Sequence, residues 1–352
     1  MSAGGGPAPK LPLEHLLCDA TNVCAKCGAM AVTSKCSRCL RVWYCDTRCQ
    51  EKHWSQHKKV CKTPAQQEAG AGQQEHRNRQ LLNASFDGEL PTVTALIAEG
   101  ADVNWAYPEC KGTPLHAASG NGHLSVVNAL MAARAVVDRV NAEGYTALML
   151  AAQEDHEAIV VALHRAAGAS VHHVSNHGCT ALHMAAQNGH VGVVRYLLRA
   201  AANPNVVSTD GDGVTPLALA SGNGHPAVVQ ALIEGGANVN YSRPHDGFTS
   251  LIYAAQNGHI EVVRALLAAG VNVDHADTQG ATSLMLAAQN GHIEVVRALL
   301  AAKADPRIVA HNGLAALSVA KVKKHTAIAA LLEARLAELS AAASAPAPSS
   351  VK

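Results

Sequence analysis

The stretch AAQNGHIEVVRALLAA stands at residues 254–269 and again, unchanged, at residues 287–302. Two identical stretches of this length, 33 positions apart, are expected in a repeat array and in few other chains. Each copy contains an Asn-Gly pair, and such a pair favours a left-handed turn between two helices. We therefore predict that the chain repeats a unit of two short helices joined by a tight turn.

A second motif, Thr-Pro/Ala/Ser-Leu, follows the same period over most of the chain. Its threonine recurs in steps of 33 to 35 residues, at Thr113, Thr146, Thr180, Thr215, Thr249 and Thr282, with Ala315 in the same register. The period and the motif resemble those of ankyrin repeats. The resemblance covers about three quarters of the chain. It implies a mainly α fold, an ankyrin-repeat α-solenoid of about eight repeats over residues 81–338.

The motif has a local physical explanation. Thr113 and Thr215 are expected to cap helices whose first residues are Pro114 and Pro216, where the missing amide hydrogen has no cost. The first and last units depart from the consensus, as the end units of a repeat array do.

Seven histidines recur in one register at the turn between the two helices, and we interpret them as structural: His123, His156, His190, His225, His259, His292 and His325.

Composition narrows the possible functions. Of the 352 residues 48% are apolar but only 3% are aromatic, which suits closely stacked small helices better than a deep cofactor pocket. The net charge of +1 argues neither for a nucleic-acid-binding protein nor for an acidic tail. No stretch has the length of a membrane span, and the N-terminus lacks the apolar core of a signal peptide. We expect a cytoplasmic or nuclear protein with no membrane partner and no small-molecule substrate.

Seven of the ten cysteines crowd into residues 24–61. In a reducing compartment, clustered cysteines indicate metal ligands sooner than disulfides. Together with one histidine, these cysteines form pairs at the spacing of zinc sites. The eight ligands are enough for two tetrahedral structural sites: Cys24, Cys27, Cys36, Cys39, Cys45, Cys49, His57 and Cys61.

The remaining segments are predicted to be a disordered N-terminal segment (1–23), a linker (62–80) that turns helical as it enters the array, and a disordered tail (339–352).

The spacing of the eight proposed zinc ligands resembles that of the MYND finger at every ligand position. The aromatic pair Trp43-Tyr44 and the run CQEKHWSQHKKVC resemble that family as well. The resemblance implies two structural Zn²⁺ ions in interleaved sites, so that each metal takes ligands from both halves of the finger. His53 is the alternative ligand to His57. The implied sets are Cys24, Cys27, Cys45 and Cys49 on one ion and Cys36, Cys39, His57 and Cys61 on the other.

MYND fingers also bind short proline-containing peptides, through a serine that follows a ligand cysteine and a Gln and a Trp on one helix. The matching residues are Ser37, Gln50 and Trp54. Two helical residues four apart face the same way, so Gln50 and Trp54 would present an amide beside an aromatic wall. The alternative is that Trp54 packs the core of the finger.

A column of variable residues follows the V-N or V-D pair in successive repeats. A position that varies on a constant scaffold is expected at a binding surface, although ordinary loop variability remains the alternative. Aromatic and arginine side chains are common anchors of interfaces. The column consists of Trp105, Arg139, His173, Val206, Tyr241, His275 and Arg307.

The sequence thus predicts a non-catalytic adaptor, whose finger binds proline-containing segments of one protein while the ankyrin array binds a second protein. One alternative is a transcription or chromatin regulator with weak nucleic-acid contact. Zinc binding would reduce the formal charge of the finger to about +4, which does not favour that alternative.

A second alternative function is a lysine methyltransferase, suggested by Asn176-His177-Gly178-Cys179. That tetrapeptide falls in the loop before Thr180, in repeat register, and no other stretch supports the enzyme.

Overall fold

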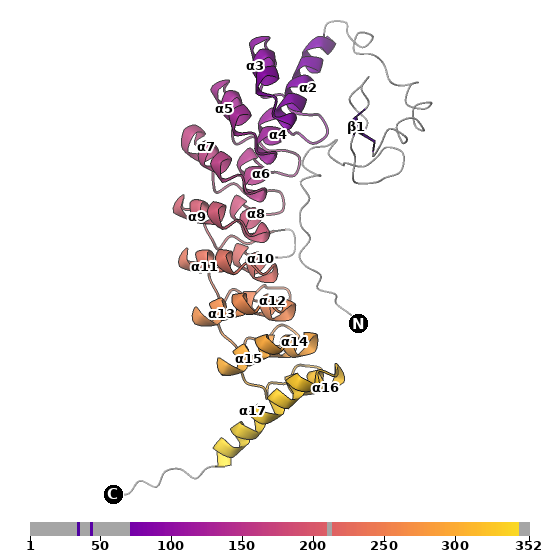
Figure 1. The fold of residues 1–352 in the computed structure, drawn as a ribbon, viewed down its shortest axis with the longest axis vertical. Helices are drawn as coiled ribbons and strands as arrows, with labels where there is room; N and C mark the ends of the chain where they lie inside the picture. Colours follow the sequence, from indigo (N-terminus) through magenta and orange to yellow (C-terminus); the bar gives the residue numbers. More distant parts are fainter. Residues whose placement is uncertain (1–33, 36–42, 45–70, 210–212, 345–352) are drawn as a thin grey trace, which may run out of the picture. The chain divides into compact units, whose positions relative to one another are not determined.

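A computed structural model describes residues 34–35, 43–44, 71–209 and 213–344 (Figure 1). All eight proposed metal ligands, and Ser37, Gln50 and Trp54, lie outside these residues. From the finger the structure describes two short strands, β1 (Ser34–Lys35) and β2 (Trp43–Tyr44). The strands are antiparallel, with Ser34 opposite Tyr44 and Lys35 opposite Trp43.

The rest of the described chain consists of helices in pairs, which confirms the predicted fold class. Each pair has an inner helix and an outer helix, and from α4 on each inner helix starts directly after the motif threonine or, in the last pair, after Ala315. The pairs are α2 (Ala71–Asp87) and α3 (Leu90–Ala98), α4 (Pro114–Gly120) and α5 (Leu124–Ala132), α6 (Ala147–Gln153) and α7 (Glu157–Ala167), α8 (Ala181–Asn188) and α9 (Val191–Arg199), α10 (Pro216–Gly222) and α11 (Pro226–Glu234), α12 (Ser250–Asn257) and α13 (Ile260–Ala268), α14 (Ser283–Asn290) and α15 (Ile293–Ala301), and α16 (Ala316–Val322) and α17 (Thr326–Ser344).

These helices fall into two compact units, residues 71–184 and residues 185–344, whose boundary lies within α8. In the first unit the inner helices α2, α4 and α6 pack in a row, and so do the outer helices α3, α5 and α7. In the second unit the inner row is α10, α12, α14 and α16, and the outer row runs from α9 to α17. Figure 1 shows the pairs stacked in chain order within each unit.

The predicted linker turns helical before the array, as expected, whereas the last helix runs past the predicted start of the tail. Helix α2 begins at Ala71, inside the predicted linker, and its Leu81 and Ala84 are buried. Helix α17 runs to Ser344, past residue 339, where the tail was predicted to start. Alanine, leucine and glutamate dominate its last turns, and these residues have high helix propensity, so the helix continues beyond the packed repeat.

The motif threonines cap the inner helices as predicted. The hydroxyl oxygen of Thr113 accepts a hydrogen bond from the amide of His116, and that of Thr215 from the amide of Ala218. Pro114 and Pro216 occupy the first turns of these helices. Thr146, Thr249 and Thr282 cap in the same way, whereas Ala315 provides no side-chain cap to the last inner helix.

The recurrent histidines are structural, as the sequence indicated. In six of them Nε2 lies 2.9 to 3.3 Å from a backbone carbonyl oxygen in the preceding repeat. The ring of His292 also covers Gly258, where an added Cβ would lie 2.5 Å from the imidazole. Gly258 has a φ of 77°, so glycine there both permits the turn and leaves room for the ring. The bonded histidines are His123, His156, His225, His259, His292 and His325.

In the part of the chain that the structure describes, no helix is long and apolar enough to cross a membrane.

Candidate interaction surface

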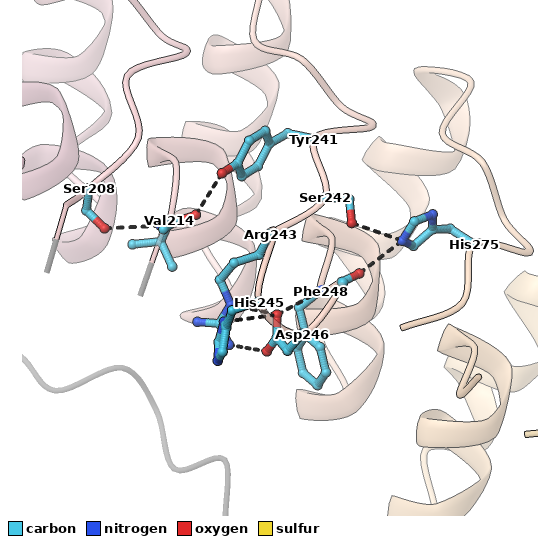
Figure 2. Close-up of polar contacts among 11 residues, drawn as sticks. Ser208, Val214, Tyr241, Ser242, Arg243, His245, Asp246, Phe248 and His275 are labelled. Atoms are coloured by element: carbon cyan, nitrogen blue, oxygen red, sulfur yellow. Dashed lines mark hydrogen bonds and ion pairs between the residues drawn. The ribbon is translucent and has the colours of Figure 1, made fainter. Parts of the chain in front are cut away.

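The predicted loop column lies on the segments that follow the outer helices, and three of its members bond through an aromatic ring to the loop of the repeat before them. Nε2 of His173 lies 3.0 Å from the carbonyl oxygen of Gly144, and Nε2 of His275 lies 2.9 Å from that of Gly247. The phenol of Tyr241 donates to the carbonyl oxygen of Gly213 at 3.1 Å (Figure 2). At equivalent positions, an imidazole or a phenol therefore bonds to a carbonyl oxygen in the loop of the preceding repeat.

The residues just before the column bond in the opposite direction, to the next repeat. Oδ1 of Asn240 accepts from the amide of Asn272 at 2.7 Å, and Oδ1 of Asp274 accepts from the amide of Asp305 at 2.9 Å. In the first unit Oδ1 of Asn104 accepts from the amide of Val136 at 2.7 Å. Tyr241 and His275 are thus held in loops that are tied to both neighbouring repeats, so the column presents its side chains from a fixed backbone.

The remaining column residues lie in other surroundings. Arg139 and Arg307 are exposed: Nη1 of Arg139 donates to the carbonyl oxygen of Asn104 at 2.9 Å, and Arg307 binds both oxygens of Asp305 at 2.9 Å. These hydrogen bonds from Arg307 hold the pKa of Asp305 below its ordinary value. Val206 is half-buried.

Trp105 belongs to a small aromatic cluster in the first unit. Its ring meets that of Tyr107 edge-on, with the centroids 5.9 Å apart and an interplanar angle of 87°. The guanidinium carbon of Arg79, on helix α2, lies 5.9 Å from the Trp105 centroid and 5.3 Å from that of Tyr107. Trp105 is half-buried and helps to hold α2 to the first loop, while part of its ring remains accessible.

A second aromatic cluster, in the second unit, was not found from the sequence. The rings of Phe248 and Tyr253 lie 5.3 Å apart, and Arg243 lies 5.7 and 5.6 Å from their respective centroids. Arg243 is paired with Asp246 through both carboxylate oxygens, as Figure 2 shows. Comparison of the two repeats that share AAQNGHIEVVRALLAA would have revealed it, because Phe248 and Tyr253 fall just before the shared stretch.

The charge of this cluster is balanced internally. Burial acts to raise the pKa of Asp246, but the hydrogen bonds from Arg243 and from the amide of Phe248 outweigh it and lower the pKa. Nε of Arg243 lies 2.8 Å from Oδ1 of Asp246, and the two side chains are only 15% and 22% exposed. The pair stays ionised and fixes the loop beside the two rings.

The tetrapeptide that suggested a methyltransferase forms a hairpin tip of the first unit. Asn176 donates from Nδ2 to the carbonyl oxygen of Ala142, and Nε2 of His177 lies 3.2 Å from Oε2 of Glu143. Cys179 is buried. These contacts are those of a loop bonded to its neighbour, in the register expected for a repeat.

Over the described residues, no group of three or more His, Cys, Asp and Glu side chains is arranged to hold a metal ion. The sequence places all proposed zinc ligands in residues 24–61, of which the structure describes only β1 and β2.

Two family models match the chain. The model described as ankyrin repeats (3 copies) matches residues 81–175, 152–243, 201–277 and 242–310. The model described as the MYND finger matches residues 24–61. Both families are non-catalytic protein-interaction modules, and a MYND finger implies zinc binding.

Proposed function

This chain belongs to the ankyrin-repeat family and carries a MYND finger ahead of the repeats, and on that basis we propose that it is a non-catalytic adaptor joining two proteins. The finger binds a proline-containing segment of one partner, and the loop column of the array binds the other. The adaptor acts in the cytoplasm or the nucleus.

The finger holds two structural Zn²⁺ ions. Thiolate and imidazole are the ligands that zinc prefers, and eight of them fill two four-coordinate shells with no position left for a reacting water. Such a site stabilises a small domain that has too little apolar core to fold alone. The proposed ligands are Cys24, Cys27, Cys36, Cys39, Cys45, Cys49, His57 and Cys61.

The peptide site of the finger consists of Ser37, Gln50 and Trp54. The chemistry of these side chains suits a proline-containing segment, because an indole packs against a proline ring while the hydroxyl and the amide bond to peptide groups.

The observation that carries the proposal for the array is the way in which its loop column is held. Tyr241 and His275 are half-exposed, yet each bonds to the preceding loop while the residue before it bonds to the next repeat. A side chain that is already ordered loses less conformational entropy on binding. The proposed contact residues are Trp105, Arg139, His173, Tyr241, His275 and Arg307.

Two variants of the full-length chain test the adaptor. Trp54→Ala removes the proposed anchor of the finger, and the double variant Arg139→Ala with Arg307→Ala removes two exposed members of the loop column. Arg264→Ala, on the outer helix α13, is the control, because Arg264 is exposed and pairs only with Glu261 in the described part of the chain. Proteins captured by each immobilised chain are quantified by mass spectrometry.

We expect the finger variant and the loop variant to lose different sets of captured proteins, and Arg264→Ala to lose neither. Zinc content and affinity for a proline-containing peptide are measured on the same Trp54→Ala protein. Lost peptide affinity with both metals retained supports the proposed peptide site, whereas lost metal assigns Trp54 to the finger core. A single set of proteins lost by both variants, or retained by both, would contradict the adaptor.

A further inference from the structure

The turn between the two helices of the last pair differs from the turns before it. From α4 on, five of the seven pairs have Asn-Gly-His at this place, whereas the last pair, α16 and α17, has Lys323-Lys324-His325. Lys324 has a φ of 62°, in the left-handed region where a side chain is strained, and Gly291 has a φ of 83° at the equivalent position one repeat earlier. Because Asn-Gly forms the same turn without that strain, folding does not account for the two lysines.

The chain then enters α17 with a threonine. Thr326 is the first residue of this helix, and the side chains of Lys323, Lys324 and Thr326 are all exposed. The other outer helices begin with Leu, Glu, Val, Pro or Ile. In the whole sequence, Thr326 is the only serine or threonine with lysine or arginine both two and three positions before it. This one turn therefore combines an accessible hydroxyl group with two cations at a fixed spacing.

The start of α17 also lacks the negative charge that several outer helices carry there. Helices α7, α13 and α15 each have a glutamate in the first turn, whereas α17 has no acidic residue in its first turn. The free amide groups make this end of a helix positive, and Lys323 and Lys324 add two further positive charges. A phosphate group on Thr326 would place a charge of about −1.5 to −2 beside these three positive groups, which is a favourable arrangement.

The last pair of helices is held less firmly than the pairs before it (Figure 1). Ala315 provides no side-chain cap to α16. At Gly280 an added Cβ would lie 3.0 Å from His311 of the next hairpin, whereas at Gly313, in the last hairpin, it would meet no atom within 4 Å. Local opening requires least free energy where packing is thinnest. The turn before α17 can therefore reach the extended conformation in which a substrate segment enters a protein kinase.

We propose that Thr326 is a phosphorylation site for a protein kinase that selects basic residues two and three positions before the acceptor. Acidic side chains of such a kinase would pair with Lys323 and Lys324. The γ-phosphoryl group of ATP passes to Oγ1 of Thr326, so that an Oγ1–phosphorus bond forms and the bond from the γ-phosphorus to the bridging oxygen breaks. The hydroxyl proton passes to a base of the kinase, and ADP leaves. The phosphate then stabilises the start of α17 and with it the last pair of the array.

The test uses the full-length chain, ATP and the catalytic subunit of cAMP-dependent protein kinase, and tandem mass spectrometry follows the phosphate on Thr326. The double variant Lys323→Gln with Lys324→Gln removes both charges and keeps a side chain at the strained position. Lys323→Arg with Lys324→Arg keeps both charges. Lys303→Gln is the control, because Lys303 has a similar φ of 68° and lies after α15 in the same unit.

We expect phosphate on Thr326 of the wild-type chain. The two glutamines should slow its addition on the order of tenfold, whereas the two arginines and Lys303→Gln should leave the rate close to that of the wild type. A wild-type chain that stays unmodified at Thr326, or a glutamine variant that is modified as fast as the wild type, would overturn the inference. The assay contains no partner protein, so its result does not depend on the adaptor function.

Hydrogen exchange measures the effect of the phosphate on the fold. In the phosphorylated chain the amides of α16 and α17 should exchange roughly fivefold more slowly than in the unmodified chain, because the added charge favours the closed form of the last pair. The amides of α12 and α13 should exchange at the same rate in both. Unchanged or faster exchange in α17 would refute the stabilising role of the phosphate.

Discussion

Histidine serves two structural purposes at the scale of single residues. At the turns between helices its Nε2 donates to a carbonyl oxygen of the preceding repeat. His116 differs because both of its nitrogens are used inside a buried cap. Its Nε2 lies 2.9 Å from the carbonyl oxygen of Tyr145, and its Nδ1 lies 2.7 Å from the hydroxyl oxygen of Thr113 and accepts from the Thr113 amide.

The buried position of His116 predicts a specific pH dependence of stability. Burial lowers the pKa of His116 from 6.5 to about 4, so between these values the unfolded chain binds a proton that the folded chain does not. The free energy of unfolding should therefore be highest above pH 6.5 and fall as the pH is lowered toward 4, by roughly 3 kcal/mol from this residue.

His116→Met isolates that contribution, because Met149 occupies the equivalent buried position in the next repeat. Urea denaturation of both proteins at several pH values between 4 and 7 measures the difference. The wild type should lose more stability on acidification than the variant does. Parallel curves for the two proteins would show that His116 is protonated without cost in the folded state.

The residue that turns the chain after each outer helix has a left-handed backbone conformation, and it is glycine in some repeats and alanine in another. After α11 and α13 the chain turns through Gly236 and Gly270, whose φ angles are 85° and 76°. After α9 the equivalent residue is Ala201, with a φ of 64°. A Cβ at Gly236 or Gly270 would meet no atom within 4 Å, so the only penalty for a side chain here is that of the left-handed backbone.

Ala201→Gly should therefore stabilise the second unit by about 1 kcal/mol, because glycine adopts positive φ without steric strain. Gly236→Ala is the reciprocal change and should destabilise the chain by a similar amount. Chemical denaturation monitored by circular dichroism measures both. Equal stabilities for wild type and Ala201→Gly would mean that the neighbouring residues relieve the strain at Ala201.

The whole molecule combines two ways of stabilising a fold. The array buries alanine, leucine and valine between successive helix pairs, and Val126, Val127 and Leu130 on α5 are fully covered. The finger is only 38 residues long, and we expect it to depend on the proposed metal ions for folding. The two parts should therefore respond differently to metal removal.

A zinc chelator should release two Zn²⁺ ions per chain, as counted by native mass spectrometry before and after treatment. The far-ultraviolet circular dichroism of the helices should remain, because the helix pairs bury an apolar core of their own. Loss of most of the helical signal on chelation would contradict this independence. One ion or none in the untreated protein would contradict the proposed ligand set.

The sequence by itself determined the repeat architecture. A period of 33 to 35 residues, the capping threonines Thr113 and Thr215 and the Asn-Gly turns are local signals, since each depends on residues a few positions apart. The structural interpretation of the turn histidines also followed from the sequence, because recurrence in one register indicates a scaffold.

Only the tertiary structure decided which surface residues act together. Tyr241 and His275 bond to carbonyl groups 28 residues earlier in the chain, and the sequence does not specify the geometry of those loops. The cluster of Arg243, Phe248 and Tyr253 forms because a loop brings an arginine against two rings from separate positions. Local chemistry fixes the elements, whereas contacts between side chains depend on how the loops pack in three dimensions.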